Sequence, residues 1–319
     1  MARRNRTPAS PLPQRDGVDA VRVRLPADPG GRFETVGEHL AARYGPAAGV
    51  ERIEEMVREG RFVTAEGRPI TRATPYAPGL HLWFHRDVPR ERPVPFPVGV
   101  VHRDERLVVA DKPHFLATTP RGGHVRETAL ARLRRDLGLP SLQPAHRLDR
   151  LTAGLVLFVA RPADRGAYQR LFAERRVRKE YEAVAAYDPA LPLPRTVRSR
   201  IEKERGVLRA YEVPGAPPNS ETLIELAALG GGLAGYRLVP ATGRTHQLRV
   251  HMSALGLPLL HDPLYARDAR PDRSAPDEAG EDYRRPLQLL ARRLEFTDPL
   301  TGEEHRFTSG LRLAHWPGR

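Results

Sequence analysis

A proline-rich segment divides this chain into two parts. Four prolines lie within residues 89–97, and proline lacks the amide hydrogen that helices and central strands need. We therefore expect a linker there, between a small domain at residues 23–88 and a larger domain at residues 98–319. Residues 1–22 mix arginine with proline and serine, which predicts a flexible basic arm.

Charge and the missing cysteines limit the expected partners and chemistry. The chain carries 52 lysine and arginine residues against 39 aspartate and glutamate residues, a net charge of +13, so nucleic acid is the expected partner. The absence of cysteine excludes disulfides, cysteine-ligated metals and thiol nucleophiles, and it fits a reducing cytoplasm. No apolar run approaches the ~18 residues of a membrane span, and residues 1–10 lack the apolar stretch of a secretory signal. We expect a cytoplasmic protein with no membrane partner.

The small domain shows helical and then strand-like patterns. Apolar residues recur at helical spacing in residues 36–44 and again in residues 50–57, with a break expected at Gly45–Pro46. Residues 61–64 and 80–85 have the composition and alternation of strands. The pattern predicts a helix-helix-β-hairpin domain.

The larger domain contains continuous apolar runs of strand length, which are typical of strands covered on both faces. Helical stripes lie between and after them, at residues 130–138 and 167–172. This pattern is compatible with a mixed α/β or an α+β domain. Residues 266–285, rich in charge and proline, predict a loop insertion. The expected strands are Leu107–Ala110, Gly154–Ala160, Lys179–Tyr187, Thr222–Leu229, Tyr236–Val239 and Pro286–Phe296.

One segment, HisArgLeuAspArgLeuThrAlaGlyLeu at residues 146–155, has the strongest chemical signal. Its carboxylate, Asp149, lies between Arg147 and Arg150 on a loop that enters an apolar strand. Neighbouring cations can hold such an aspartate ionised while the strand fixes its position, so that it acts as a nucleophile or a base. A loop aspartate in surface ion pairs fits this window equally well.

Two further segments carry candidate site residues. Tyr181 shares a strand face with Ala183 and Ala185, which leaves room for a flat base to stack and a hydroxyl to relay a proton, although a core tyrosine is an equal alternative. A helix is expected to begin after Thr245 and end at Gly256, with Arg249 about one turn into it. The alternative for that arginine is a phosphate-binding or surface role.

Taken in order, the motifs of residues 98–307 resemble those of the RluA-type pseudouridine synthases, a family that isomerises uridine in structured RNA. The resemblance implies an α+β fold, with a mixed, mainly antiparallel sheet and flanking helices. Residues 54–68 are similar to the small RNA-binding module named after the fourth ribosomal protein of the small subunit. The family motifs are HisArgLeuAspArg-x-Thr-x-Gly-Leu, LysGluTyrGluAla (179–183), GlyArgThrHisGlnLeuArgValHisMet (243–252), LeuHisAspProLeuTyr (260–265) and AspLysProHisPhe (111–115).

The resemblance also assigns roles. It implies that Asp149 attacks the ribose or removes a ribose proton, that Tyr181 and Arg249 are its catalytic partners, and that Arg249 pairs with it directly. A buried target uridine must be flipped out of the RNA, and Arg147 is expected to fill the gap. The family uses neither a cofactor nor a metal, and its substrate here is expected to be ribosomal RNA, with transfer RNA as the second choice. Further RNA contacts are expected from His146, Arg150, Lys179 and Arg244.

Three other interpretations compete with this one. A metal hydrolase could use His246, His251, His261 and Asp262, but a five-residue separation on a helix does not bring the first two histidines onto one ion. A non-catalytic RNA-binding or ribosome-assembly factor could keep the fold and use only its charge. The GlyXaaGlyXaaXaaGly pattern at residues 230–235 is expected to be a hairpin turn, because the residues after it favour a strand. A monomer is the expected state.

Overall fold

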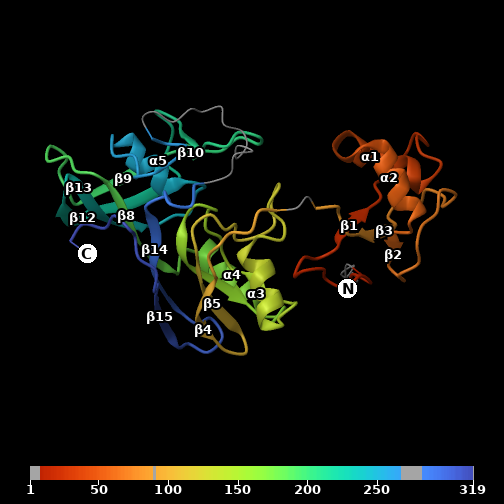
Figure 1. Ribbon diagram of the computed structural model, residues 1–319, viewed down its shortest axis with the longest axis horizontal. Coiled ribbons are helices and arrows are strands. Elements are labelled where there is room, and N and C mark those ends of the chain that lie inside the picture. The colour runs from red at the N-terminus through yellow and green to blue at the C-terminus, as the bar shows by residue number, and fades with distance from the viewer. Residues whose placement is uncertain (1–7, 89–90, 267–281, 319) are drawn as a thin grey trace. The chain divides into compact units, whose positions relative to one another are not determined.

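The computed structural model describes residues 8–88, 91–266 and 282–318 (Figure 1). The chain divides into two compact units, residues 1–91 and 92–319. That division lies inside the proline-rich segment. Each unit has its own apolar core.

The first unit combines two helices with a three-stranded sheet of order β1-β3-β2. Thr35 and Glu38 form a capping box at the start of α1, since the Thr35 side chain accepts from the Glu38 amide and the Glu38 carboxylate accepts from the Thr35 amide. Apolar side chains from both helices and from the sheet pack into one core. The elements are β1 (Val21–Arg24), α1 (Val36–Ala48), α2 (Val50–Arg58), β2 (Val63–Thr64) and β3 (His81–Phe84).

Two details of this unit correct the sequence prediction. Strand β1 begins at Val21, inside the segment predicted as an arm, and it pairs with β3 to add a third strand to the expected hairpin. The break between the helices lies at Gly49, with φ 87°, and α1 continues through Gly45 and Pro46. Glycine suits a left-handed position better than any other residue, which is why the chain turns there.

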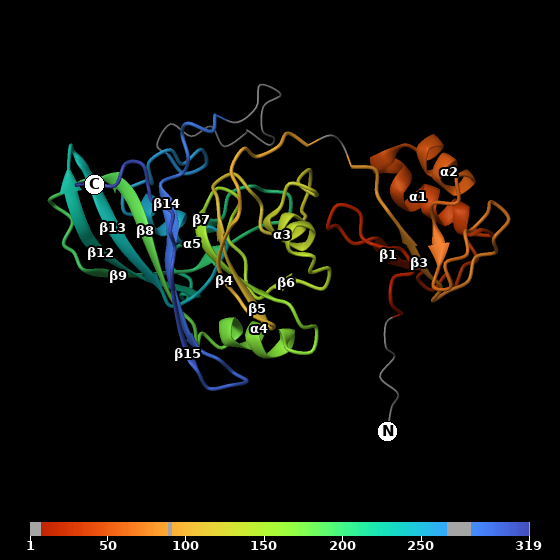
Figure 2. The same cartoon turned by 60° about the horizontal axis from the view of Figure 1, so that its bottom comes forward.

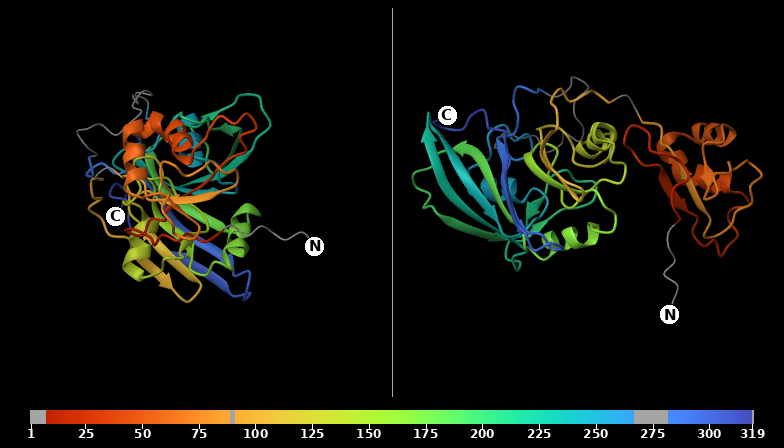
Figure 3. Two further views of the ribbon diagram at one scale, coloured as in Figure 1. Left: turned by 90° about the vertical axis from the view of Figure 1, so that its right-hand side faces the viewer. Right: turned by 90° about the horizontal axis from the view of Figure 1, so that it is seen from below.

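The second unit is built on a ten-stranded sheet among its described residues (Figures 2 and 3). Its main path runs β4-β5-β7-β14-β8-β13-β12-β9, while β15 pairs with β14 and β6 with β7. Every pairing within this described sheet is antiparallel except that of β14 with β7. The sheet confirms the predicted α+β, mainly antiparallel fold. Its strands are β4 (Gly99–Arg103), β5 (Leu107–Lys112), β6 (Gln143–Pro144), β7 (Ala153–Val159), β8 (Arg178–Ala186), β9 (Arg195–Ser199), β12 (Ser220–Gly230), β13 (Leu233–Pro240), β14 (Leu289–Thr297) and β15 (Glu304–Thr308).

The helices of this unit cover the sheet on both faces. One side of β5 and β7 packs with α3 (Ala129–Leu137), and their other side packs with α4 (Arg165–Ala173). The continuous apolar runs predicted this double cover. Helix α5 (Gln247–Ala254) packs its Leu248 and Met252 against β8 and β13.

The remaining predictions have mixed outcomes. The glycines at 230–235 lie in the β12–β13 hairpin, as expected. Six strands were missed: β4, β6, β9, β15 and the small pair β10 (Ile201–Glu202) and β11 (Tyr211–Glu212). The predicted insertion at residues 266–285 lies largely outside the described residues. Within the described ranges, none of the helices is long and apolar enough to cross a membrane.

Candidate active site

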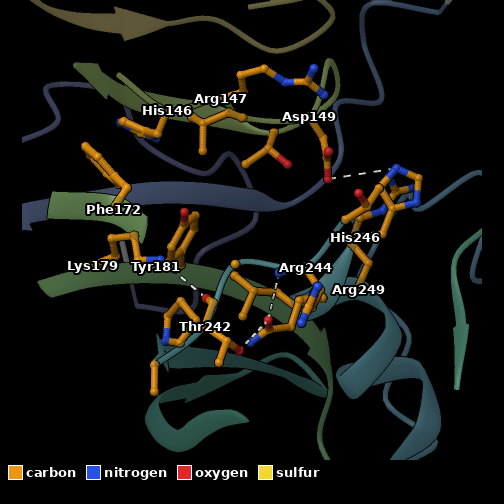
Figure 4. Close-up of a pocket in the computed structure, with 18 of the residues that line it drawn as sticks. His146, Arg147, Asp149, Phe172, Lys179, Tyr181, Thr242, Arg244, His246 and Arg249 are labelled. Atoms are coloured by element: carbon orange, nitrogen blue, oxygen red, sulfur yellow. Dashed lines mark hydrogen bonds and ion pairs between the residues drawn. The ribbon is translucent and has the colours of Figure 1, made fainter. Parts of the chain in front are cut away.

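A cavity of 570 Å³ opens where three segments of the second unit meet (Figure 4). The segments are the loop before β7, the start of β8, and the turn that joins β13 to α5. Asp149 is the one carboxylate among the lining residues in the described part of the chain. The lining includes seven of the eight predicted site residues, His146, Arg147, Asp149, Lys179, Tyr181, Arg244 and Arg249.

Buried side chains hold the loop of Asp149 from behind. The Thr118 hydroxyl donates to the carbonyl oxygen of Leu148 at 2.8 Å and accepts from its amide at 3.2 Å. Lys112 is fully buried, and its Nζ donates to the carbonyl oxygen of Arg150 at 3.2 Å. The backbone on each side of Asp149 is therefore fixed, which preorganises the carboxylate.

Two histidines add further support to this loop. The His146 Nε2 accepts from the amide of Leu157 in β7 at 3.1 Å, and the ring stacks on Phe172 with centroids 4.2 Å apart. Burial lowers the pKa of His146 to about 3, so the ring is neutral and can accept. The His114 Nδ1 lies 2.8 Å from the carbonyl oxygen of Leu151. This gives His146, predicted to contact RNA, a hydrogen bond within the protein.

Tyr181 stands on β8 at the floor of the cavity. Its face of the strand is shared with Ala183 and Ala185, which pack in the same core cluster. Burial raises the pKa of the Tyr181 phenol, and the negative charge of Asp149 adds to the shift. The hydroxyl therefore stays protonated at neutral pH.

Arg249 does not pair directly with Asp149, which corrects the sequence prediction. Its Nε and Nη2 donate to the two carboxylate oxygens of Asp262 at 2.8 and 2.7 Å. Both side chains of this pair are buried, at 2% and 0% exposure. Asp149 still contributes electrostatically, since burial opposes the Arg249 charge while Asp262 and then Asp149 raise its pKa.

The start of α5 also differs from the prediction. Thr245 was expected to cap the helix, but the residue at the N-cap position is His246, in a left-handed conformation with φ 57°. Its Nε2 lies 3.9 Å from Oδ2 of Asp149, and its side chain is 13% exposed. Sequence reasoning considered this histidine only as a metal ligand and missed its place beside Asp149.

Gln247 braces the wall of the cavity that carries Arg244. Its Oε1 accepts from the Thr242 hydroxyl at 2.7 Å and from the Arg244 amide at 3.0 Å. Lys179 Nζ donates to the Thr242 carbonyl oxygen at 3.3 Å. Burial lowers the pKa of Lys179, and Arg175 adds to this effect. The result is a rigid turn with two cationic side chains on the cavity wall.

Exposed arginines lie among the residues that line the cavity. Arg147, Arg175 and Arg244 belong to the lining, and Arg175 has a left-handed φ of 58°. Arg150 is the predicted site residue that the structure places outside the lining, where its guanidinium donates to the carbonyl oxygen of Phe115 at 3.4 Å. Positive charge at an opening of this size suits a phosphate-bearing ligand.

Within the described ranges, no cluster of three or more histidine, aspartate or glutamate side chains has the arrangement of a metal site. Of the four residues in the rival metal hypothesis, Asp262 is bound by Arg249. His251 instead bonds to the hydroxyls of Thr222, Ser199 and Ser220.

Several residues that support the site belong to family motifs, but the sequence did not predict what each of them does. Lys112 and His114 belong to the AspLysProHisPhe segment, and Asp262 and Tyr265 to LeuHisAspProLeuTyr. The motifs identify these positions. The contacts between their side chains depend on how distant strands pair in the sheet, which the motifs do not predict. Thr118 has no motif signal.

Comparisons with known proteins fit this geometry. A family model described as RNA pseudouridylate synthase matches residues 106–254, which include every predicted site residue. The dual-specificity RNA pseudouridine synthase RluA of Pasteurella multocida is 35% identical over 228 residues, or 66% of this chain and 92% of that protein. The mitochondrial tRNA pseudouridine(32) synthase of Saccharomyces cerevisiae is 31% identical over 176 residues, 54% of this chain and 38% of that protein. The solved structure of human RNA pseudouridylate synthase domain containing 1 matches the fold with a TM-score of 0.54 at 24% identity, covering 70% of this chain and 86% of that one.

Proposed function

This chain belongs to the RluA-type family of RNA pseudouridine synthases, and from that premise we propose that Asp149 breaks the glycosidic bond of the target uridine. The protein is an isomerase that acts on RNA. The observation that carries the proposal is the position of Asp149, which is the one carboxylate in the described lining of the cavity and is held by buried side chains on both sides.

The chemistry balances within one nucleotide. The bond between the ribose and the uracil nitrogen breaks, a bond from the ribose to a uracil ring carbon forms, and the proton lost from that carbon is matched by one gained at the nitrogen. Asp149 either attacks the anomeric carbon or removes a ribose proton when the first bond breaks. The freed uracil stays in the cavity, so it reacts with the same ribose and no second reactant has to bind. Holding the two reacting groups in place can lower the activation barrier by up to ~7 to 11 kcal/mol in well-oriented reactions. The isomerisation needs no cofactor.

Tyr181 and Arg249 complete the proposed catalytic set. Its position in the cavity lining and its protonated hydroxyl support a role for Tyr181 in stacking on the freed base and in proton transfer. Arg249, held by Asp262, adds a fixed positive charge whose field reaches Asp149.

The arginines and the lysine of the cavity are the proposed RNA contacts. Arg147 is exposed, and a planar guanidinium can fill the space that a flipped nucleotide leaves in the RNA. The positions of Lys179 and Arg244 in the cavity lining support contacts with phosphates beside that nucleotide. His146 and Arg150, by contrast, act on the loop that carries Asp149.

The RNA substrate is proposed from the relatives. The bacterial relative is named a dual-specificity RNA enzyme and the yeast relative a transfer RNA enzyme, names that do not rank the two classes. We keep ribosomal RNA as the first candidate and transfer RNA as the second. A cytoplasmic location, a monomeric state and an RNA-binding role for residues 23–88 remain predictions.

A direct assay tests this function. The protein would be incubated with unmodified transcripts of ribosomal RNA and transfer RNAs, and new pseudouridines would be mapped at single-nucleotide resolution. We expect a small number of sites, all lost with Asp149→Asn. An assembly factor would bind the same transcripts and leave every uridine unchanged.

A further inference from the structure

His246 lies beside Asp149 in the cavity and has no assigned role in the proposed reaction. Its backbone is left-handed, with φ 57°, a conformation that few residues other than glycine adopt and that histidine adopts more often than most. The conformation places its imidazole in the cavity, with Nε2 lying 3.9 Å from Oδ2 of Asp149 (Figure 4). Strained backbone of this kind is often retained where a side chain must occupy one position.

Hydrogen bonds to Tyr265 fix which nitrogen of His246 carries the proton. The Tyr265 oxygen accepts from the Ala210 amide at 2.8 Å, and its single hydrogen is donated to the Ala210 carbonyl oxygen at 3.0 Å. The remaining neighbour of that oxygen is Nδ1 of His246 at 2.9 Å, which must therefore be the donor. The proton sits on Nδ1, and Nε2 presents a lone pair.

The neutral state of the ring follows from its surroundings. Burial lowers the pKa of His246 to about 4, and Arg249 contributes to this shift while Asp149 opposes it. At neutral pH, Nε2 of His246 is consequently a hydrogen-bond acceptor, and it lies beside the carboxyl group of Asp149. A bound group that carries a hydrogen beside Asp149 can therefore donate to Nε2.

The ribose supplies one such group. In a nucleotide inside an RNA chain, the 3′ and 5′ oxygens are esterified, which leaves the 2′-hydroxyl as the free hydroxyl of the sugar. That hydroxyl is attached next to the anomeric carbon, where the proposed reaction takes place. When Asp149 acts on the anomeric carbon or on the carbon next to it, the 2′-hydroxyl lies close to Asp149. The hydroxyl is then also within reach of His246.

We propose that Nε2 of His246 accepts a hydrogen bond from the 2′-hydroxyl of the target uridine, with Tyr265 holding the imidazole in the accepting tautomer. This inference rests on the proposed function. It makes His246 a substrate-binding residue that selects ribose at the target position and orients the sugar toward Asp149.

A double-mutant cycle in RNA binding isolates the proposed contact. It combines removal of the 2′-hydroxyl from the RNA with His246→Ala in the protein. A synthetic RNA hairpin carrying a mapped target site would contain either uridine or 2′-deoxyuridine at that position. Binding would be measured with Asp149→Ala proteins, because they do not consume the uridine and alanine adds no donor beside His246. We expect loss of the 2′-hydroxyl to weaken binding about tenfold when His246 is present and less than about twofold in the His246→Ala protein. Equal losses in both proteins would overturn the proposal.

Variants with intact Asp149 separate recognition from structural damage. His246→Ala should slow single-turnover pseudouridine formation, and His246→Gln should recover part of the rate, since its amide oxygen can reach the Nε2 position. Tyr265→Phe keeps an aromatic ring beside Arg249 but removes the hydroxyl that holds the proton of His246 on Nδ1. The preference of this variant for uridine over 2′-deoxyuridine should therefore fall. An unchanged preference in Tyr265→Phe would contradict the tautomer assignment. If the unsubstituted protein modifies no RNA, the proposed function fails instead.

Discussion

Lys112 places an ammonium group in the core directly behind Asp149. Its Nζ donates to three carbonyl oxygens, those of Pro113, Leu116 and Arg150. Burial lowers the pKa of Lys112 to about 7, and the charge of Asp149 opposes the shift. Each carbonyl oxygen gains a donor from Lys112, and a buried acceptor left unsatisfied would itself cost free energy.

Replacing Lys112 by methionine should therefore damage both stability and activity. We expect the free energy of unfolding to fall by about 1 to 3 kcal/mol, the usual cost of leaving buried hydrogen-bond partners unsatisfied. Single-turnover pseudouridine formation should slow because the loop of Asp149 is released. Chemical denaturation measures the first effect, and Lys203→Met, at a partly exposed lysine, is the matched control. Unchanged stability and rate in Lys112→Met would refute the supporting role.

Buried neutral histidines make the second unit sensitive to acid. His251 is fully buried, and burial lowers its pKa to about 4, as it does for His114 and His246. The unfolded chain binds protons at these rings near pH 6.5, whereas the folded protein resists protonation down to about pH 4. The unfolded state thus holds more protons between these values, and the free energy of unfolding should fall as the pH is lowered through them.

Urea denaturation at pH 7.5 and pH 5.0 measures this effect. The chain has two tryptophans, so in a Trp83→Phe background the fluorescence of Trp316 reports on the second unit. We expect a lower midpoint at pH 5.0. His251→Gln should be less stable at pH 7.5 and should depend less steeply on pH. Equal midpoints at both pH values would show that these histidines protonate freely in the folded state.

At the scale of elements, the close approach of β7 and β14 joins the two halves of the sheet. Gly154 has φ 110°, and a Cβ there would stand 2.3 Å from the carbonyl oxygen of Ala291. The glycine of the Asp149 motif is therefore required by packing, since it allows the one parallel pairing of the described sheet, Leu290 with Ala153 and Ala291 with Gly154.

Gly154→Ala should destabilise the second unit by about 2 to 4 kcal/mol, because it combines backbone strain with a clash against main chain. The matched control is Gly166→Ala in α4, where the nearest atom to an added Cβ is 3.5 Å away, at the end of the Arg170 side chain. That change should be neutral or stabilising, as alanine favours a helix interior. Thermal denaturation of the two variants distinguishes these outcomes, and equal melting temperatures would refute the packing argument.

The sequence predicted the elements whose pattern is local. The apolar runs that became β5 and β7 and the stripes that became α3 and α4 carry their own periodicity. The sheet order was not predictable, because β14 pairs with strands more than a hundred residues away. Strand β9 was missed because its side chains are half-buried or exposed and show no apolar alternation.

In the site, too, local motifs were predictive and contacts between distant residues were not. Motifs identified Asp149 and Tyr181, and the structure places both on one cavity. The partner of Arg249 was predicted wrongly, because only the fold shows that Asp262 accepts from both of its donors, Nε and Nη2. His246 was missed as a neighbour of Asp149 because its left-handed backbone, rather than its helix position, sets its direction.

For the whole molecule, the positive charge is unevenly divided. Residues 92–319 hold 37 of the 52 basic and 27 of the 39 acidic side chains, so most of the net charge of +13 lies in the unit that contains the cavity. A phosphate backbone should consequently be bound mainly by this unit.

The salt dependence of RNA binding tests this assignment. Arg147→Gln and Arg244→Gln should each reduce the slope of log affinity against log salt by about 0.7 to 0.9, the value for one lost phosphate contact. Arg68→Gln, at an exposed arginine of the first unit, should leave the slope unchanged. A change as large in Arg68→Gln would show that the first unit also contacts phosphate.

The most direct test compares chemistry and binding in the same preparation of Asp149→Asn. On a transcript with a mapped site, we predict that RNA affinity stays within about threefold while pseudouridine formation falls at least a thousandfold, as expected for loss of a reacting group. Asp136→Asn, at an exposed aspartate of α3, should retain both properties. Pseudouridine formation by Asp149→Asn at the rate of the unsubstituted protein would contradict the account.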